Sequence, residues 1–329
     1  MKNWIILFAF LTADLMLAVE ATPTETACAG VKSLVPPKDD VPSPETIAQL
    51  KGCDSEALYY GIGKPIDYPA ALGCAYAELQ AGDELVFGGS AVLMMIYANG
   101  GLGKKRLDLA LHFACQVSGA PAETEGRVSE LVRRTKTPES KVFDLCDHTT
   151  SGFLMGHCTR RDSRLTDAKR DSKMQTAIAN WNEAEKAAFE KLRKASDAFI
   201  EARGQNEVDL SGTARSAFVI AEEEILKKDF LQSLEKLENK TAPKYSEAQA
   251  KAEDKKLNRI YRKVITKKDG NLDAGTVTPE GIEKCQRAWL SYRNGWVEFA
   301  KVKYPNVSAS VLLAWFTKKR NHMLRAFVK

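Results

Sequence analysis

The stretches AFEKLRKASDAFIEAR (188–203) and TPEGIEKCQRAWLSYR (278–293) carry matching residues at a constant spacing of 90 positions. The matches are Leu192 with Ile282, Ala198 with Ala288, Phe199 with Trp289, Ile200 with Leu290, and Arg203 with Arg293. A single shift shared by apolar and charged positions indicates a duplicated structural unit. We therefore expect two related helical bundle units, over residues 139–239 and 244–329.

Both units show the periodicity of long helices. Apolar residues recur at spacings of three and four, which is typical of amphipathic α-helices. No run of alternating apolar and polar residues predicts a strand. The segment Thr241-Ala242-Pro243 separates the copies, because the residue before a proline disfavours helical backbone. The sequence thus predicts an all-α fold.

Upstream, two helical hairpins share one plan. ALYYGIGKPIDYPAALGCAYAE (57–78) and MIYANGGLGKKRLDLALHFACQ (95–116) each place a Gly-x-Gly turn and a basic connector before an alanine-rich helix. The turn glycines Gly61/Gly63 and Gly101/Gly103 lie 40 residues apart, as do Ala70 and Ala110. This period is typical of α/α repeats. We expect a short repeat region over residues 44–136, ending in an amphipathic helix.

The N-terminus has the organisation of a secretory signal peptide over residues 1–21. Lys2 precedes the apolar run WIILFAFLTA, and a small-residue site stands at Val19-Glu20-Ala21. Residues 22–43 are rich in proline and predict a linker. No later segment reaches the roughly 18 apolar residues of a membrane span. We expect a periplasmic or secreted bacterial protein without a transmembrane segment in the mature chain.

Export makes disulfides the default for the seven cysteines, because thiols oxidise outside the cytoplasm. Cys146 and Cys158, 12 residues apart, are predicted to pair. The alternative is a zinc site that adds His148 and His157, since thiolates and imidazoles suit zinc. We favour the disulfide and expect no metal and no cofactor.

Cys53 and Cys74 stand on the two helices of the first hairpin and are predicted to pair. The competing arrangement joins Cys28 to Cys53 and Cys74 to Cys115, and sequence alone does not decide between them. An odd number of cysteines leaves at least one thiol outside these pairs. Cys285 lies on the apolar stripe of its helix and is predicted to be a small core residue.

No catalytic constellation is visible, so we predict that the chain is not an enzyme. The four histidines are scattered, and neither Gly-x-Ser-x-Gly nor His-Glu-x-x-His occurs. The aromatic residues Trp289, Tyr292, Trp296 and Phe299 follow helical spacing. Core packing is the favoured interpretation of this stripe, with a ligand platform as the alternative.

Three motifs of the second copy are similar to those of a known family. DKKLNRIYRKVI (254–265) resembles an A-D-x-x-L-N-x-x-Y helix, QRAWLSYR (286–293) a fairly specific helical string, and WFTKKRNHML (315–324) a T-x-x-R-x-x-x-L end. Together they resemble the LprI N-terminal domain family of lysozyme inhibitors over residues 250–327. The motif positions are Asn258, Tyr261, Trp289, Tyr292, Arg293 and Arg320.

The first copy matches the same family more weakly. Cys146 with Met155-Gly156-His157-Cys158 resembles its cysteine-framed entry, and KASDAFIEAR (194–203) replaces QRAWLSYR, with Phe199 and Arg203 at motif positions. The resemblance implies an exported, helical, non-enzymatic module linked to lysozyme inhibition. The upstream hairpins resemble Sel-one-like repeats through their Gly-x-Gly turns and Asp67-Tyr68.

Charge distribution suggests where a partner would bind. The net charge of +5 does not indicate a nucleic-acid binder. Lysozymes of the common animal type are basic, so an inhibitor should present acids. The candidate face lies in the first copy and comprises Glu201, Glu207, Asp209, Glu222, Glu223 and Glu224. From Phe299 to Lys329 there are seven Lys/Arg residues and no acid, which makes anionic polymer binding by this basic C-terminus an alternative.

These observations favour an exported helical protein that binds a protein partner in the cell envelope. The specific hypothesis is that this partner is a lysozyme, which the protein inhibits by occlusion. The alternative is a scaffold or adaptor that docks through the α/α repeats.

Overall fold

The computed structural model describes residues 21–82, 86–267 and 272–328. Within these ranges all regular structure is helical and no strand occurs, which confirms the predicted all-α class. The predicted signal peptide falls on residues 1–20, apart from Ala21, and so lies outside the described residues. No described helix has the length and apolar character needed to cross a membrane.

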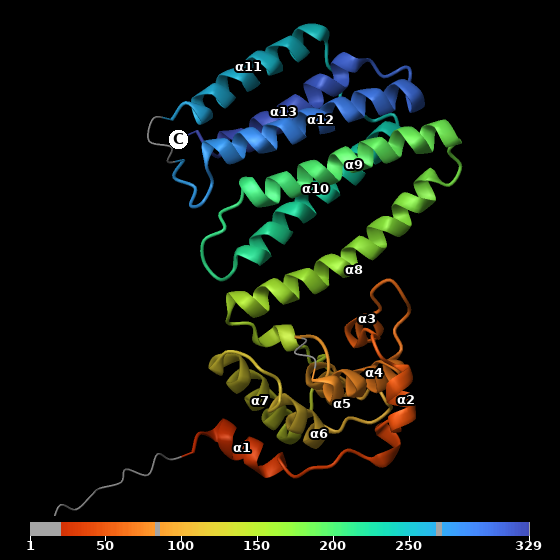
Figure 1. Ribbon diagram of the computed structural model, residues 1–329, viewed down its shortest axis with the longest axis vertical. Helices are drawn as coiled ribbons and strands as arrows, with labels where there is room; N and C mark the ends of the chain where they lie inside the picture. Colours follow the sequence, from red (N-terminus) through yellow and green to blue (C-terminus); the bar gives the residue numbers. More distant parts are fainter. Residues whose placement is uncertain (1–20, 83–85, 268–271, 329) are drawn as a thin grey trace, which may run out of the picture.

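Short helices form the N-terminal part and long helices form the C-terminal bundle (Figure 1). The short elements are α1 (Pro23–Val31), η1 (Lys38–Asp40), α2 (Pro44–Gln49), α3 (Ser55–Tyr60), α4 (Tyr68–Ala81), α5 (Ser90–Asn99), α6 (Leu107–Ala114), α7 (Pro121–Lys136) and η2 (Leu145–His148). The long helices are α8 (Gly152–Ile178), α9 (Glu183–Asn206), α10 (Arg215–Glu238), α11 (Glu247–Ile265), α12 (Pro279–Lys303) and α13 (Ala309–Arg325). Helix α8 lies between the two parts (Figure 1).

The first helix corrects the expectation of a linker over residues 22–43. Thr22 and Glu25 form a reciprocal capping box, and Pro23 occupies the first turn of α1. Helix α1 packs against α6 and α7, and a disulfide joins Cys28 to Cys115. Pro23, which we interpreted as part of an irregular linker, instead begins a helix. The absence of its N–H does not destabilise the helix, because an N–H in the first turn has no partner within the helix.

The two hairpins repeat with a period one residue shorter than predicted. Helix α4 begins at Tyr68 and α6 at Leu107, 39 residues apart. The left-handed residues that end α3 and α5 are Gly61 (φ 74°) and Gly100 (φ 73°), also 39 apart. Gly100 rather than Gly101 is thus the counterpart of Gly61. Consecutive glycines allow either register in sequence, and only the backbone conformation selects one.

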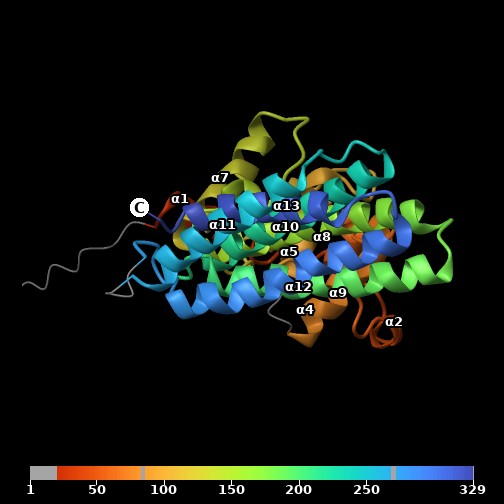
Figure 2. The ribbon, with the colours of Figure 1, turned by 90° about the horizontal axis from the view of Figure 1, so that it is seen from above.

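The six long helices form two sets of three in matching order. In each set the first helix packs on the third (α8 on α10, α11 on α13), and the second also packs on the third. The second helices of the sets, α9 and α12, lie side by side and contact each other most extensively (Figure 1 and Figure 2). These are the helices that carry the duplicated stretches.

Helices α9 and α12 run antiparallel, and their contact is centred on the duplicated positions. Gly295 approaches Leu192 at one end, and Gly281 approaches Asn206 at the other. Phe199 stacks on Tyr292 near the middle, with ring centroids 5.3 Å apart. The two copies therefore meet through equivalent surfaces, as the subunits of a two-fold dimer do.

One apolar core serves both copies. It includes Phe189, Phe199 and Phe230 from the first copy and Trp289 and Trp296 from the second, all buried. A separate core fills the N-terminal part, and it extends to Phe143, Leu145, Leu154 and Cys158. The predicted domain boundary at residue 139 therefore cuts through the N-terminal core, and α8 contributes to both.

Candidate functional site

The acidic residue Glu207, predicted to face a partner, is instead fully buried. Its carboxylate accepts hydrogen bonds from Arg320 Nη1 (2.8 Å) and Nη2 (2.5 Å) and from Arg203. The side chains of Glu207 and Arg320 have no solvent exposure. Glu207 therefore cannot contact a partner, and its place in the candidate face was wrong. It joins the copies instead, because Arg320 belongs to α13 and Glu207 follows α9.

Charge pairing keeps this buried site ionised. Burial alone would raise the pKa of Glu207, but Arg320 and then Arg203 outweigh it and hold the pKa below its usual range. Gln286 Oε1 accepts from Arg320 Nε at 2.8 Å and completes the guanidinium's partners. Burial, followed by the negative charge of Glu207, raises the pKa of the Cys285 thiol. Cys285 is thus a buried, unpaired thiol, as predicted, and is held in its neutral form.

Two further acids of the candidate face also bind internal cations. Glu222 accepts from Arg203 Nε at 2.5 Å. Glu224 accepts from Arg170 and from Ser163 Oγ (2.7 Å) on α8. These bonds fasten α10 to α9 and to α8, so both carboxylates have structural partners in the bundle.

The rest of the candidate face is dispersed. Glu201 is exposed on α9 and accepts only from Gln205 Nε2 (3.0 Å). Asp209 accepts from the N–H and the hydroxyl of Ser211 beyond the helix. Glu223 is half-buried, and this burial raises the pKa of its carboxyl group. The six acids thus do not form one contiguous docking surface.

The family-motif residues are chiefly packing residues. Phe199, Trp289 and Tyr292 are buried in the shared core. Trp296 and Phe299 are buried as well, so the aromatic stripe is core, as predicted, and offers no ligand platform. This arrangement maximises the apolar area removed from water.

The remaining motif positions lie on or near α11. Arg293 packs over the Trp289 ring (4.9 Å to the centroid) and pairs with Asp254 of α11 at 3.4 Å. Asn258 is exposed and donates to Asp254 (3.3 Å), whereas Tyr261 is half-buried against the core. Apart from Asn258, the motif therefore specifies how α11, α12 and α13 pack.

Internal acids also neutralise much of the basic C-terminus. Lys303 pairs with Glu185 at 3.2 Å, and Lys319 pairs with Asp229 at 2.7 Å. Arg320 is the buried partner of Glu207. These cations join α13 and the end of α12 to the first copy, so they do not form a free basic surface.

Both predicted disulfides are present, Cys53–Cys74 and Cys146–Cys158, together with Cys28–Cys115. The zinc alternative fails because its thiols are bonded to each other, and because His148 lies against Phe143 while His157 lies against Phe153. Three disulfides are compatible with an oxidising, extracytoplasmic compartment.

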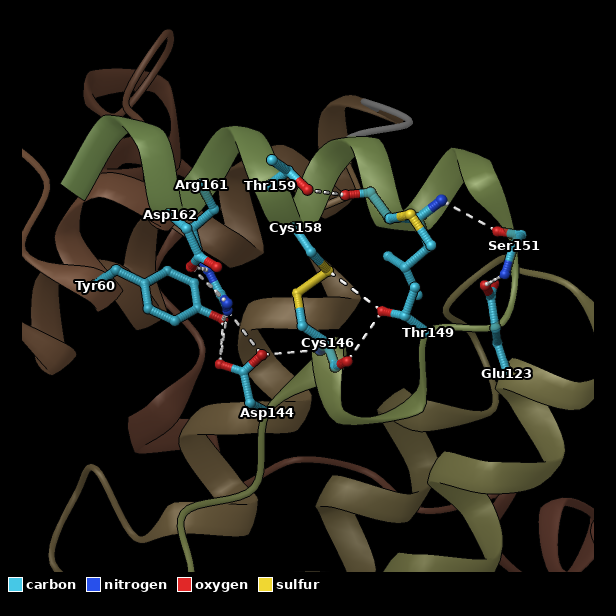
Figure 3. The surroundings of a disulfide bond; sticks show 12 residues. Tyr60, Glu123, Asp144, Cys146, Thr149, Ser151, Cys158, Thr159, Arg161 and Asp162 are labelled. Carbon is cyan, nitrogen blue, oxygen red and sulfur yellow. Dashed lines mark hydrogen bonds and ion pairs between the residues drawn. A yellow bond between two sulfur atoms is a disulfide. The ribbon is translucent and has the colours of Figure 1, made fainter. Parts of the chain in front are cut away.

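The disulfide Cys146–Cys158 is part of the joint between the repeats and the bundle (Figure 3). Beside it, Arg161 of α8 donates to Asp144 (2.7 Å) and to Tyr60 Oη (2.9 Å) of the first hairpin. Glu123 of α7 accepts from the Ser151 N–H (2.7 Å) just before α8 begins. Charged and covalent links therefore fix α8 on the repeat region.

Helices α8 and α10 expose large apolar side chains. Phe153, Phe218 and Ile225 are 63%, 53% and 60% exposed, and we call these three residues the α8–α10 face. Hollows of about 360, 490 and 410 Å³ follow these two helices, the first lined by Phe153 and the second by Ile225. Exposed apolar residues beside hollows are typical of protein-docking surfaces. Sequence reasoning missed this face, although Phe218 and Ile225 stand seven residues apart on one side of a helix.

No protein-family model matches this chain, and comparisons with curated proteins and with solved structures gave no match either. The functional class must then follow from the residues themselves. Among those described, the buried residues Glu207, Arg320 and Arg170 form ion pairs inside the bundle, and the larger hollows are open to solvent.

Proposed function

We propose that this chain is an exported, non-enzymatic helical binding protein that acts by contacting another protein of the cell envelope. The observation that carries the proposal is the α8–α10 face, where three large apolar side chains are exposed and two of them, Phe153 and Ile225, line open hollows. An exposed apolar residue on a monomer gains free energy when a partner covers it. The motif resemblance makes a lysozyme the first partner to test.

Rigidity supports this proposal. Helix α8 is fastened to Tyr60 of the repeats by Arg161, to η2 by the disulfide of Cys158, and to α10 by Arg170. A preformed surface loses little conformational entropy when it binds. The partner would thus meet one fixed shape, which suits inhibition by occlusion.

The test is a lysozyme turbidity assay with oxidised protein comprising residues 22–329. We expect the protein to slow lysis, and the triple variant Phe153→Ser, Phe218→Ser, Ile225→Ser to lose at least about 90% of its potency, because it removes most of the apolar contact. The matched control, Val35→Ser, Ile66→Ser, Val142→Ser, removes three exposed apolar residues elsewhere and should retain potency.

Failure has two distinct forms. No slowing of lysis at large molar excess eliminates lysozyme as the partner. Equal loss in both triple variants eliminates the α8–α10 face. If charge governed docking, the variant Glu201→Lys, Asp209→Lys, Glu223→Lys would abolish inhibition. We expect this variant to retain inhibition, because these acids are dispersed.

The scaffold alternative is favoured by one observation. Two turn residues of the repeats, Ile66 and Leu102, are 54% and 38% exposed. The second turn packs on the start of α4, since Gly101 lies against the Tyr68 ring. Under this alternative, Ile66→Ser with Leu102→Ser would abolish capture of an envelope partner, whereas the triple variant of the α8–α10 face would not.

A further inference from the structure

A row of cations on α11 has no acidic partner in the part of the chain that the structure describes. Lys255, Arg259, Arg262 and Lys263 are exposed, and no ion pair involves them. They line an open hollow of about 450 Å³, in which Asn258 and Thr266 are the other lining residues. No acid lines this hollow. We call these four cations the α11 row.

The neighbouring cations make the α11 row distinctive. Lys251 pairs with Glu247 at 2.8 Å, Lys256 pairs with Glu253 at 3.7 Å, and Lys267 pairs with Asp273 at 3.3 Å. The nearby acids thus pair with other cations and leave the row uncompensated. Unpaired like charges on one face repel each other, so a ligand that brings negative charge between them relieves that repulsion.

The geometry of the row suits an extended ligand. A helix rises about 1.5 Å per residue, so residues 255 to 266 span roughly 16 Å. Positions 255, 259, 262/263 and 266 place a donor on each successive turn, about 5 to 6 Å apart. A flexible chain with repeated negative groups can contact every turn at once.

We propose that the α11 row binds a linear polyanion carrying phosphate groups. Guanidinium groups donate forked hydrogen bonds to phosphate oxygens, and the row supplies Arg259 and Arg262. The amide of Asn258 and the hydroxyl of Thr266 add neutral donors at the same hollow. The α11 row therefore takes the place of the basic C-terminus as the candidate site for an anionic polymer, because internal acids largely neutralise the cations of the C-terminus.

Two other anionic partners fit this surface less well. Insertion into a lipid surface requires exposed large apolar residues, and none of those exposed in the described chain lies on α11. Single-stranded nucleic acid is held by bases stacking on aromatic rings, but Tyr261, the aromatic residue of α11, packs against the core. A phosphate polymer that has no nucleobases and is not part of a lipid bilayer therefore fits this surface better than the other two partners.

The α11 row lies apart from the α8–α10 face. Helices α9, α12 and α13 stand between α11 and α8 in the stack (Figure 1). The inner face of α11 is occupied, because Leu257, Ile260 and Val264 are buried in the shared core. The protein would therefore hold a polymer and a protein partner at the same time, and the polymer site does not depend on the proposed function.

The test measures binding of inorganic polyphosphate by titration calorimetry, using oxidised protein comprising residues 22–329 at several salt concentrations. We expect log Kd to change with log salt with a slope of about 3, as four released counterions imply. The variant Lys255→Gln, Arg259→Gln, Arg262→Gln, Lys263→Gln should bind at least about tenfold more weakly and with a flatter slope. All four side chains are exposed, so thermal unfolding should be unchanged.

The matched control removes four exposed cations elsewhere, through Lys32→Gln, Lys51→Gln, Lys104→Gln and Lys136→Gln. It changes the net charge equally and should bind polyphosphate within about twofold of the unmodified protein. Equal weakening in both variants would show that only the overall charge matters and would overturn the proposal. Absence of polyphosphate binding, or tighter binding to vesicles of phosphatidylglycerol and phosphatidylcholine, would overturn it as well.

Discussion

At the scale of single residues, Glu207 is the most consequential side chain that we identify. It carries a buried charge, yet it has two guanidinium partners and a depressed pKa. A buried ion pair adds little net stability compared with an apolar pair, but removing one partner leaves the other charge uncompensated. The fold of the bundle therefore depends on this carboxylate more than on any exposed acid.

Neutralising this residue should destabilise the bundle. We predict that Glu207→Gln lowers the free energy of unfolding by about 3 to 5 kcal/mol at neutral pH, because Arg320 keeps its charge in the core. Denaturant unfolding followed by tryptophan fluorescence measures this, because Trp181, Trp289, Trp296 and Trp315 all lie in the shared core. As a control, Glu201→Gln removes an exposed acid of α9 and should change stability by under about 0.5 kcal/mol.

The same residue predicts a pH dependence. A carboxyl whose pKa is lower in the folded than in the unfolded protein contributes stability above its unfolded pKa, about 4.3 for glutamate, and loses it as pH falls through the folded value. The stability gap between the unmodified protein and Glu207→Gln should thus be constant near neutral pH and narrow below about pH 4. A gap that widens on acidification would contradict the depressed pKa.

At the scale of elements, two glycines allow α8 to approach α10 closely. A Cβ at Gly152 would lie 2.4 Å from Ala214 N, and one at Gly156 would lie 2.1 Å from Ser216 Oγ. The start of α8 therefore presses directly on the backbone at the start of α10. This contact positions Phe153 beside the first hollow of the α8–α10 face.

A methyl group at this crossing should be costly. We predict that Gly152→Ala lowers the free energy of unfolding by about 1 to 3 kcal/mol, because backbone atoms must move apart. Gly30→Ala on α1 is the control, since nothing lies within 4 Å of its Cβ position. That change should stabilise its helix by about 0.5 to 1 kcal/mol. Chemical denaturation measures the free energy of unfolding of both variants. Equal values for the two would contradict the close approach of α8 to α10.

The elements also show what local sequence can specify. Capping residues and periodicity predicted helices, but the hairpin register depended on a hydrogen bond. The Asp67 N–H donates to the Leu58 carbonyl, and the Arg106 N–H donates to the Tyr97 carbonyl, which fixes the 39-residue period. Two adjacent glycines fit either register, so their order in the chain could not reveal which one is left-handed.

At the scale of the whole molecule, the duplication could be predicted from the sequence because its core positions keep their apolar character. Phe199 and Trp289 are both buried, as the shared pattern implied. The burial of acids in the candidate face could not be predicted from the sequence. The local sequence around an acid that pairs with a distant arginine does not differ from that around an exposed acid. Glu207 and Arg320 are 113 residues apart, and only the folded chain brings them together.

The duplication also determines how the molecule should unfold. Phe199 stacks on Tyr292, and Phe230 packs on Trp296, so neither copy buries its aromatic residues alone. Elements that share a core open together. The two copies should thus behave as one cooperative unit rather than as two domains.

Native-state hydrogen exchange of the oxidised protein, read by mass spectrometry on peptides from α9 and α12, tests this claim most directly. We predict that the slowest amides of both helices exchange with the same opening free energy and the same dependence on denaturant. A peptide of α12 that opens independently of α9 would contradict the single duplicated core on which this account rests.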